Sequence, residues 1–166
     1  WSQGFATMNA VDKVLVAAEQ GFKASLTRLF ELLRIPSIST DPAYKSNCQE
    51  AATWLVKELQ ALGFDANART TPGHPMIVAH YTPKSATAKT THALFYGHYD
   101  VQPVDPLELW VSAPFDPTIR NGELYARGAV DDKGQVQMNL KGVEAHLKAT
   151  GSLPVNVKFL IEGEEE

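Results

Sequence analysis

The fold of this chain is decided by the run Val155-Asn-Val-Lys-Phe-Leu-Ile161, which is apolar and rich in β-branched side chains. A run of this kind is typical of a strand buried in a parallel sheet. The residues directly before it, 133–150, have the pattern of a helix that Asp131 or Asp132 caps and Gly151 ends. A helix that leads into a buried strand indicates an α/β domain.

The rest of the chain continues this alternation of helices and strands. Helical spacing of apolar residues predicts one helix that ends at Ile35-Pro36, because the residue before a proline avoids the helical region. The predicted elements are helices over 11–34 and 48–62, strands over 64–69, 76–81, 93–99 and 123–127, and loops over 82–91 and 103–117.

The composition is that of a globular protein, with 44% hydrophobic and 20% charged residues. The 15 basic and 19 acidic residues give a net charge of -4. Glu162, Glu164, Glu165 and Glu166 account for this excess, so the remaining charges balance. Because no basic surplus is left to attract phosphate groups, we expect no binding to nucleic acid.

The cellular location is predicted from three features that the sequence lacks: a cysteine pair, a membrane span and a signal peptide. Cys48 is the only cysteine, which excludes an intrachain disulfide. No apolar run approaches the length of a membrane span, and the first residues lack the pattern of a signal peptide. We therefore predict a cytoplasmic protein with no membrane contact. Residues 1–10 are interpreted as an N-terminal extension or an expression remnant, and 11–166 as part of one catalytic domain.

A histidine and an aspartate follow the predicted third strand. His98 and Asp100 are two residues apart, so both point to the same side if the strand geometry continues. A histidine with a nearby carboxylate is a candidate metal ligand with the partner that orients it. The alternative is a histidine packed at the rim of the sheet, and this pair alone favours that alternative.

Two acidic groups follow at other strand ends. Asp131 and Asp132 can bind a divalent cation or, alternatively, cap the following helix. Glu165 and Glu166 follow the buried strand, where they can serve as ligand and general base or form a solvated tail. Separate elements that bring His, Asp and Glu to one sheet edge indicate a hydrolytic metal site.

Three motifs resemble the co-catalytic zinc metallopeptidase family of carnosine dipeptidases, aminoacylases, acetylornithine deacetylases and succinyl-diaminopimelate desuccinylases. They are Phe95-Tyr-Gly-His-Tyr-Asp-Val-Gln-Pro103, Leu124-Tyr-Ala-Arg-Gly-Ala-Val-Asp-Asp-Lys-Gly134 and Ile161-Glu-Gly-Glu-Glu-Glu166. Segments 110–115 and 34–39 are also similar to that family. The resemblance covers residues 11–166 and is strongest to the dipeptidase branch.

The resemblance implies a role for each site residue. His98 would bind one of two Zn²⁺ ions, Glu166 the other, and Asp131 both, with Mn²⁺ or Co²⁺ as alternative metals. Glu165 would be the general base that deprotonates a water held between the metals, and Asp100 would orient His98. The family typically has a cis peptide bond after the bridging aspartate, so we predict a cis Asp131–Asp132 bond.

The resemblance also implies a fold that these residues only partly supply. It is a three-layer α/β/α zinc-exopeptidase-like domain with a mixed, mostly parallel sheet, truncated here before its C-terminal half and lid domain. Two further zinc ligands of the family follow the last motif present. Since catalytic zinc usually has three protein ligands, we expect these 166 residues to bind metal weakly and to be nearly inactive.

The expected activity is zinc-dependent hydrolysis of a peptide bond in dipeptides or short peptides. One alternative is an N-acyl amino acid amidohydrolase of the same family, because amide cleavage uses the same site. Another is an inactive fragment or a binding module. The resemblance further implies a full-length homodimer formed through the lid domain.

Overall fold

A four-stranded sheet in the order β1–β2–β6–β3 forms the centre of residues 8–166, the part of the chain that the computed structural model describes. The strands are β1 (Asp65–Arg69), β2 (Met76–Tyr81), β3 (His92–His98) and β6 (Asn156–Glu162). Strands β3 and β6 run parallel, joined by a crossover through a helix, whereas β1 with β2 and β2 with β6 are antiparallel.

The α/β class and the mixed sheet are confirmed, and one detail is corrected. Within the described residues only one of the three strand pairings is parallel, so this part of the sheet is not mostly parallel. The short connection 70–75 joins β1 to β2 as a hairpin, which makes these two strands antiparallel, and β2 also runs antiparallel to the distant β6.

The helices follow the predicted order, with one correction. They are α1 (Ala10–Gln20), α2 (Phe22–Leu33), α3 (Lys45–Ala61) and α4 (Lys133–Thr150), with short 3-10 turns η1 (Pro42–Tyr44) and η2 (Leu107–Leu109). The single helix predicted over 11–34 is interrupted at Gly21. A Cβ there would lie 2.7 Å from Nζ of Lys141, so the tip of this side chain from α4 lies close to the break.

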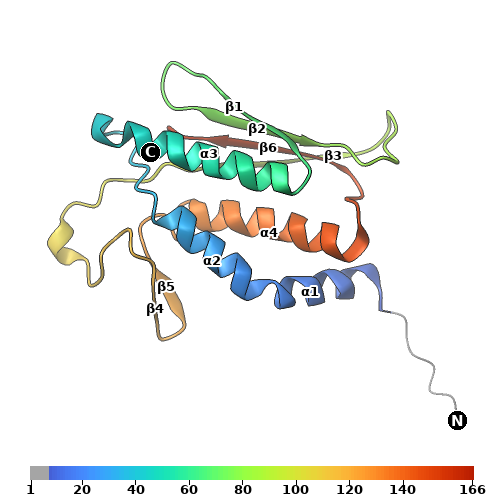
Figure 1. Ribbon diagram of the computed structural model, residues 1–166, viewed down its shortest axis with the longest axis horizontal. Coiled ribbons are helices and arrows are strands. Elements are labelled where there is room, and N and C mark those ends of the chain that lie inside the picture. The colour runs from blue at the N-terminus through green and yellow to red at the C-terminus, as the bar shows by residue number, and fades with distance from the viewer. Residues whose placement is uncertain (1–7) are drawn as a thin grey trace, which may run out of the picture.

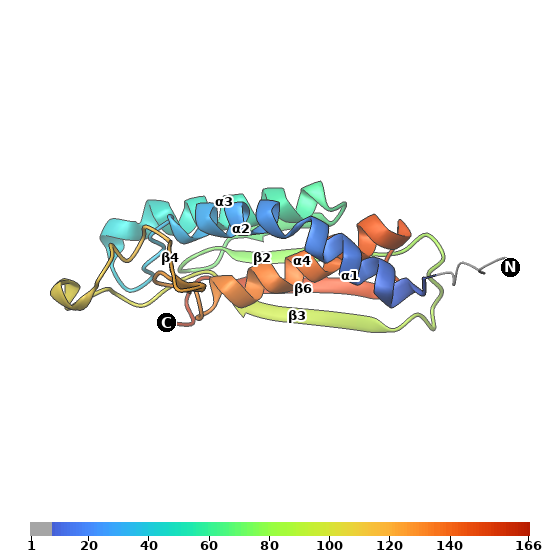
Figure 2. The ribbon, with the colours of Figure 1, turned by 90° about the horizontal axis from the view of Figure 1, so that it is seen from below.

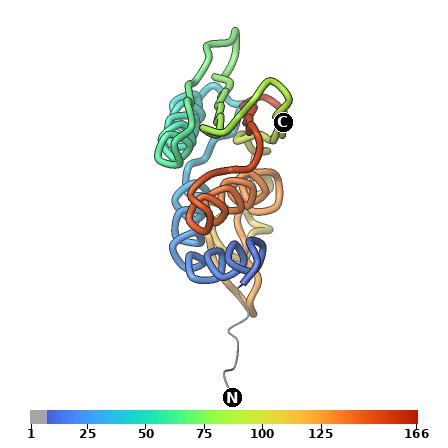
Figure 3. The backbone as a smooth tube through the Cα atoms, turned by 90° about the vertical axis from the view of Figure 1, so that its right-hand side faces the viewer, coloured from blue at the N-terminus to red at the C-terminus, as the bar shows by residue number. Residues whose placement is uncertain are grey.

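All four helices lie on one side of the sheet (Figures 1 and 2), and α4 lies between α1 and the sheet (Figure 3). The core fills the space between helices and sheet, with Leu55, Leu59, Ile77, Leu140 and Ile161 almost completely buried. The opposite face of β3 exposes Leu94 and Tyr96. Residues 8–166 therefore form two of the three expected layers.

A second, two-stranded sheet was only half predicted. Strands β4 (Thr118–Arg120) and β5 (Glu123–Tyr125) form a hairpin, of which the sequence pattern indicated only the second strand. Its turn residues Asn121 and Gly122 have φ angles of 53° and 83°, the backbone that favours these two residue types in tight hairpins.

Most of the extension proposed for residues 1–10 lies outside the described residues, which begin at Met8. Within them, Asn9 caps α1, which begins at Ala10. Among the residues described, no helix combines the length and apolar character that crossing a membrane requires.

Candidate metal centre

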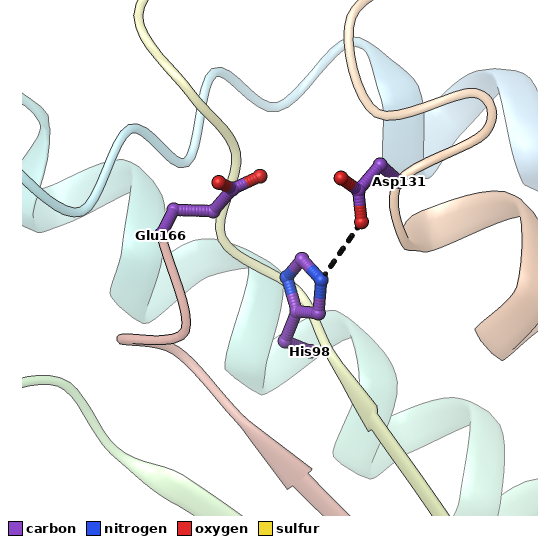
Figure 4. Close-up of side chains that lie close together, drawn as sticks. All are labelled: His98, Asp131 and Glu166. Carbon is purple, nitrogen blue, oxygen red and sulfur yellow. Dashed lines mark hydrogen bonds and ion pairs between the residues drawn. The ribbon is translucent and has the colours of Figure 1, made fainter.

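Three of the predicted site residues come together at one edge of the sheet. His98 ends β3, Asp131 precedes α4 and Glu166 follows β6, and their ligand atoms all lie within 4.8 Å of one another (Figure 4). Nε2 of His98 is 3.1 Å from Oδ1 of Asp131. One imidazole nitrogen and two carboxylates that converge in this way suit a divalent cation such as zinc.

The parallel pairing of β3 with β6 explains this convergence. His98 is in register with Glu162, so the carboxyl ends of both strands meet at the same edge. The chain then turns at Gly163, which lies directly against the ring of Tyr99, where a Cβ would collide with that ring. This close approach directs the next residues across the edge, toward His98.

Asp100 is completely buried and has more contacts than its predicted role requires. Its Oδ1 lies 3.4 Å from Nδ1 of His98, in agreement with an orienting function. Its two carboxylate oxygens also accept hydrogen bonds from the backbone N–H groups of Glu165, at 3.3 Å, and Glu166, at 3.0 Å. One buried carboxylate therefore positions the histidine and the acidic segment together.

The acidic side chains around His98 favour a positive charge at this site. Burial lowers the pKa of this imidazole, but the charge of Asp100 and the hydrogen bond that His98 donates to Asp131 outweigh burial, so the pKa is raised above its ordinary value. Because Nδ1 faces the backbone carbonyl and side chain of Asp100, Nε2 is left facing Asp131. In the neutral ring with its proton on Nδ1, Nε2 would be free to bind a cation.

The candidate general base lies beside this cluster. The carboxylate of Glu165 is 48% exposed, and its Oε2 is 3.8 Å from Nε2 of His98. Glu166 accepts a hydrogen bond from the side chain of Gln102. Both glutamates thus face the site, and neither forms part of a fully solvated tail. The predicted cis bond between Asp131 and Asp132 is confirmed.

The structure adds contacts near the site that the sequence analysis missed. Oδ2 of Asp132 accepts a hydrogen bond from the backbone N–H of His98 at 3.1 Å. Lys133 is completely buried, and its Nζ donates to the carbonyl oxygens of Leu32, at 3.1 Å, and Ile35, at 2.6 Å. Burial lowers the pKa of Lys133 to about 7. The sequence placed both residues only at a helix start, because nothing in it shows which distant groups they meet.

The segment 34–39, which the sequence analysis compares with the family, contacts the backbone directly after β3. Oγ of Ser37 donates a hydrogen bond to the carbonyl oxygen of Tyr99 at 2.6 Å. The carbonyl oxygen of Ser37 in turn accepts the N–H of Val101 at 3.0 Å. These two contacts hold the backbone on both sides of Asp100, so the segment belongs to the framework of the site.

Two other residues considered in the sequence have structural surroundings. Burial raises the pKa of the Cys48 thiol to about 11, which disfavours the thiolate that nucleophilic catalysis requires. The indole N–H of Trp110 donates to the carbonyl oxygen of Val104 at 3.0 Å, within the proline-rich loop.

Comparison with known proteins agrees with this geometry. Residues 94–166 match peptidase family M20/M25/M40. The chain is 32% identical to the Cys-Gly metallodipeptidase dug1 of Schizosaccharomyces pombe, over 95% of this chain and 35% of that protein. It is 35% identical to the Beta-Ala-His dipeptidase of Homo sapiens, over 82% of this chain and 25% of that protein.

A solved structure shows the same fold. The dipeptidase Dug1p from Saccharomyces cerevisiae superimposes with a TM-score of 0.83 at 27% identity, covering 95% of this chain and 36% of that one. The chain thus spans about a third or less of the length of these relatives. Motifs, site geometry and comparisons agree that the chain belongs to peptidase family M20/M25/M40.

Proposed function

We propose that the full-length protein is a metal-dependent hydrolase that cleaves the peptide bond of dipeptides or short peptides. The observation that carries this proposal is the convergence of His98, Asp131 and Glu166, with Glu165 beside them. The relatives named above are dipeptidases, which supports a short peptide as the substrate.

The proposed centre would hold a pair of divalent cations. We propose that His98 and Asp131 bind one Zn²⁺ and that Asp131 and Glu166 bind the second, with Mn²⁺ or Co²⁺ as alternatives. The side chain of Asp131 is 74% exposed, and its Oδ1 already lies 3.1 Å from Nε2 of His98, which supports this shared role. When bound, the cations would polarise the scissile carbonyl and make a water more acidic.

The protein's own contribution to the reaction is proton transfer and orientation. A carboxylate oxygen of Glu165 accepts a proton from the attacking water, and the same oxygen then delivers it to the leaving amine nitrogen. The backbone N–H of Glu165 donates a hydrogen bond to Asp100, and this bond fixes the backbone from which the Glu165 side chain extends. Asp100 also keeps Nε2 of His98 directed toward the ligand cluster.

These residues supply an incomplete set of ligands by themselves. Each zinc would have two protein ligands within this chain, one of them shared, whereas catalytic zinc usually has three. We therefore propose weak metal binding and little turnover for residues 1–166 alone, and that 11–166 form part of one catalytic domain. The lid domain, the homodimer and the cytoplasmic location are likewise proposals for the full-length protein.

The test compares substrates and metal dependence in the full-length protein. We expect hydrolysis of Cys-Gly or β-Ala-His to exceed that of N-acetyl amino acids, to stop after chelation and to return with added Zn²⁺. Faster hydrolysis of N-acetyl amino acids would favour the amidohydrolase alternative. Dipeptide hydrolysis that survives complete removal of metal would contradict the proposal.

A further inference from the structure

We propose that Asp132 is a positioning residue, which fixes His98 relative to Asp131 through a hydrogen bond to the His98 backbone. This inference rests on the proposed function, because it assigns a role toward the same metal centre. It concerns a residue that the sequence alone interprets most simply as the N-terminal cap of α4.

The side chain of Asp132 does not cap the helix. Asp132 occupies the N-cap position of α4, and its backbone carbonyl accepts the N–H of Val136 at 2.9 Å. A capping aspartate would also accept an N–H of the first helical turn through its side chain. No such bond is formed, so the side chain of Asp132 is directed elsewhere.

The carboxylate instead reaches the backbone of the neighbouring strand. Its Oδ2 accepts the N–H of His98 at 3.1 Å. In the described sheet β3 is an edge strand, and the next N–H, that of Tyr99, is the one that donates to β6, through the carbonyl of Glu162. The His98 N–H therefore points away from the sheet, and Asp132 provides the acceptor that this edge otherwise lacks.

Two consecutive aspartates thus hold one histidine at two points. Asp131 Oδ1 lies 3.1 Å from the ring nitrogen Nε2, and Asp132 Oδ2 lies 3.1 Å from the backbone nitrogen of the same residue. The backbone contact determines how far the start of α4 lies from the end of β3. That separation in turn sets the distance between two proposed metal ligands.

Gly97 makes this contact sterically feasible. A Cβ at this position would lie 2.7 Å from Oδ2 of Asp132 and 2.7 Å from Cγ2 of Val136, closer than real Cβ atoms are found. A side chain at residue 97 would therefore crowd both the carboxylate of Asp132 and the side chain of Val136. Gly97 therefore leaves open the space that the carboxylate of Asp132 occupies beside β3.

The experiment uses the full-length protein and three substitutions. Asp132→Ala removes the acceptor, Asp132→Asn retains it as an amide oxygen, and Asp41→Ala is the matched control. Asp41 is an exposed aspartate whose side chain does cap, accepting the N–H of Ala43 at 2.9 Å at the start of η1. The readouts are zinc affinity by chelator competition, the visible spectrum of the Co²⁺-substituted protein, and kcat and KM.

We expect Asp132→Ala to lower zinc affinity by about 10- to 100-fold, the usual effect of removing a group that orients a metal ligand. The Co²⁺ spectrum should change, and kcat should fall more than KM rises. Asp132→Asn should restore zinc affinity to within a few-fold of the wild type. Asp41→Ala should leave metal affinity and spectrum unchanged.

A second variant keeps the inference testable if Asp132→Ala fails to fold. Gly97→Ala retains Asp132 but crowds its carboxylate and the side chain of Val136, so a folded Gly97→Ala protein should reproduce the loss of zinc affinity. Wild-type zinc affinity and an unchanged Co²⁺ spectrum in either folded variant would overturn the inference. Failure of the proposed function is distinguishable, because the wild type itself would then show no metal-dependent hydrolysis.

Discussion

The buried carboxylate of Asp100 accepts a hydrogen bond from the backbone N–H of Glu166 at 3.0 Å, across 66 positions of the chain. Its other oxygen accepts the N–H of Glu165 and lies 3.4 Å from Nδ1 of His98. Asp100 therefore connects the ends of β3 and β6 and sets the positions of the histidine and both glutamates.

Removal of this carboxylate should weaken metal binding. We expect Asp100→Ala to lower the zinc affinity of the full-length protein by about 10- to 100-fold, because His98 and Glu166 both lose the group that orients them. Asp100→Asn should lie between Ala and wild type, since its amide offers one acceptor oxygen in place of two. Chelator competition measures both, with Asp116→Asn in an exposed loop as the control. Wild-type affinity in Asp100→Ala would contradict this role.

Lys133 should contribute to stability through the end of α2. Its Nζ donates to the carbonyl oxygens of Leu32 and Ile35, and Lys133→Met keeps the volume but removes both hydrogen bonds. We expect the free energy of unfolding to fall by roughly 2 kcal/mol, about 1 kcal/mol for each of the two hydrogen bonds lost. Urea denaturation measures this, and Lys57→Met at an exposed position on α3 should change little. Equal or greater stability in Lys133→Met would show that these two bonds do not outweigh the burial of the charge.

The ion cluster around Glu144 should make stability depend on pH. Burial alone would raise the pKa of Glu144, but hydrogen bonds from Lys148 and Lys141, together with Arg28, lower it to about 2. Because an unfolded glutamate has a pKa of about 4.3, this stabilisation is complete above roughly pH 5 and is lost as the pH falls toward 2. We expect Glu144→Gln to be less stable than wild type at pH 7, by roughly 1–2 kcal/mol.

The difference between Glu144→Gln and wild type should decrease steadily between pH 5 and pH 2 in urea denaturation. Glu31→Gln, at an exposed position on α2, serves as the control and should show little effect at pH 7. A difference that stays constant from pH 7 to pH 2 would exclude the ionised carboxylate as its source.

The sequence predicted the elements that depend on local patterns. The helix over 133–150 and the strand over 76–81 have the predicted bounds, because apolar periodicity, Gly151 and the flanking turns specify them locally. The break at Gly21 was missed, because apolar residues continue at helical spacing on both sides of it. Strand direction was also only partly predicted, because pairing depends on contacts far apart in the sequence.

The site was predicted in the same uneven way. His98, Asp131 and Glu166 were found because three motifs at strand ends resemble one family, and the structure brings these residues together. The bonds made by Asp132 and Lys133 were not found, because a residue at a helix start carries no signal for a partner on another element. Gly97 was the available clue, since a glycine next to a ligand indicates close approach by another group.

The most direct test of the central claim compares Glu165→Gln with Glu166→Gln in the full-length protein, measuring bound zinc and kcat for a dipeptide. If Glu165 is the proton acceptor and Glu166 a ligand, Glu165→Gln should keep its zinc and lose about 10²- to 10⁴-fold in kcat. Glu166→Gln should lose zinc as well as activity. Wild-type turnover by Glu165→Gln, or full zinc content in Glu166→Gln, would contradict this assignment.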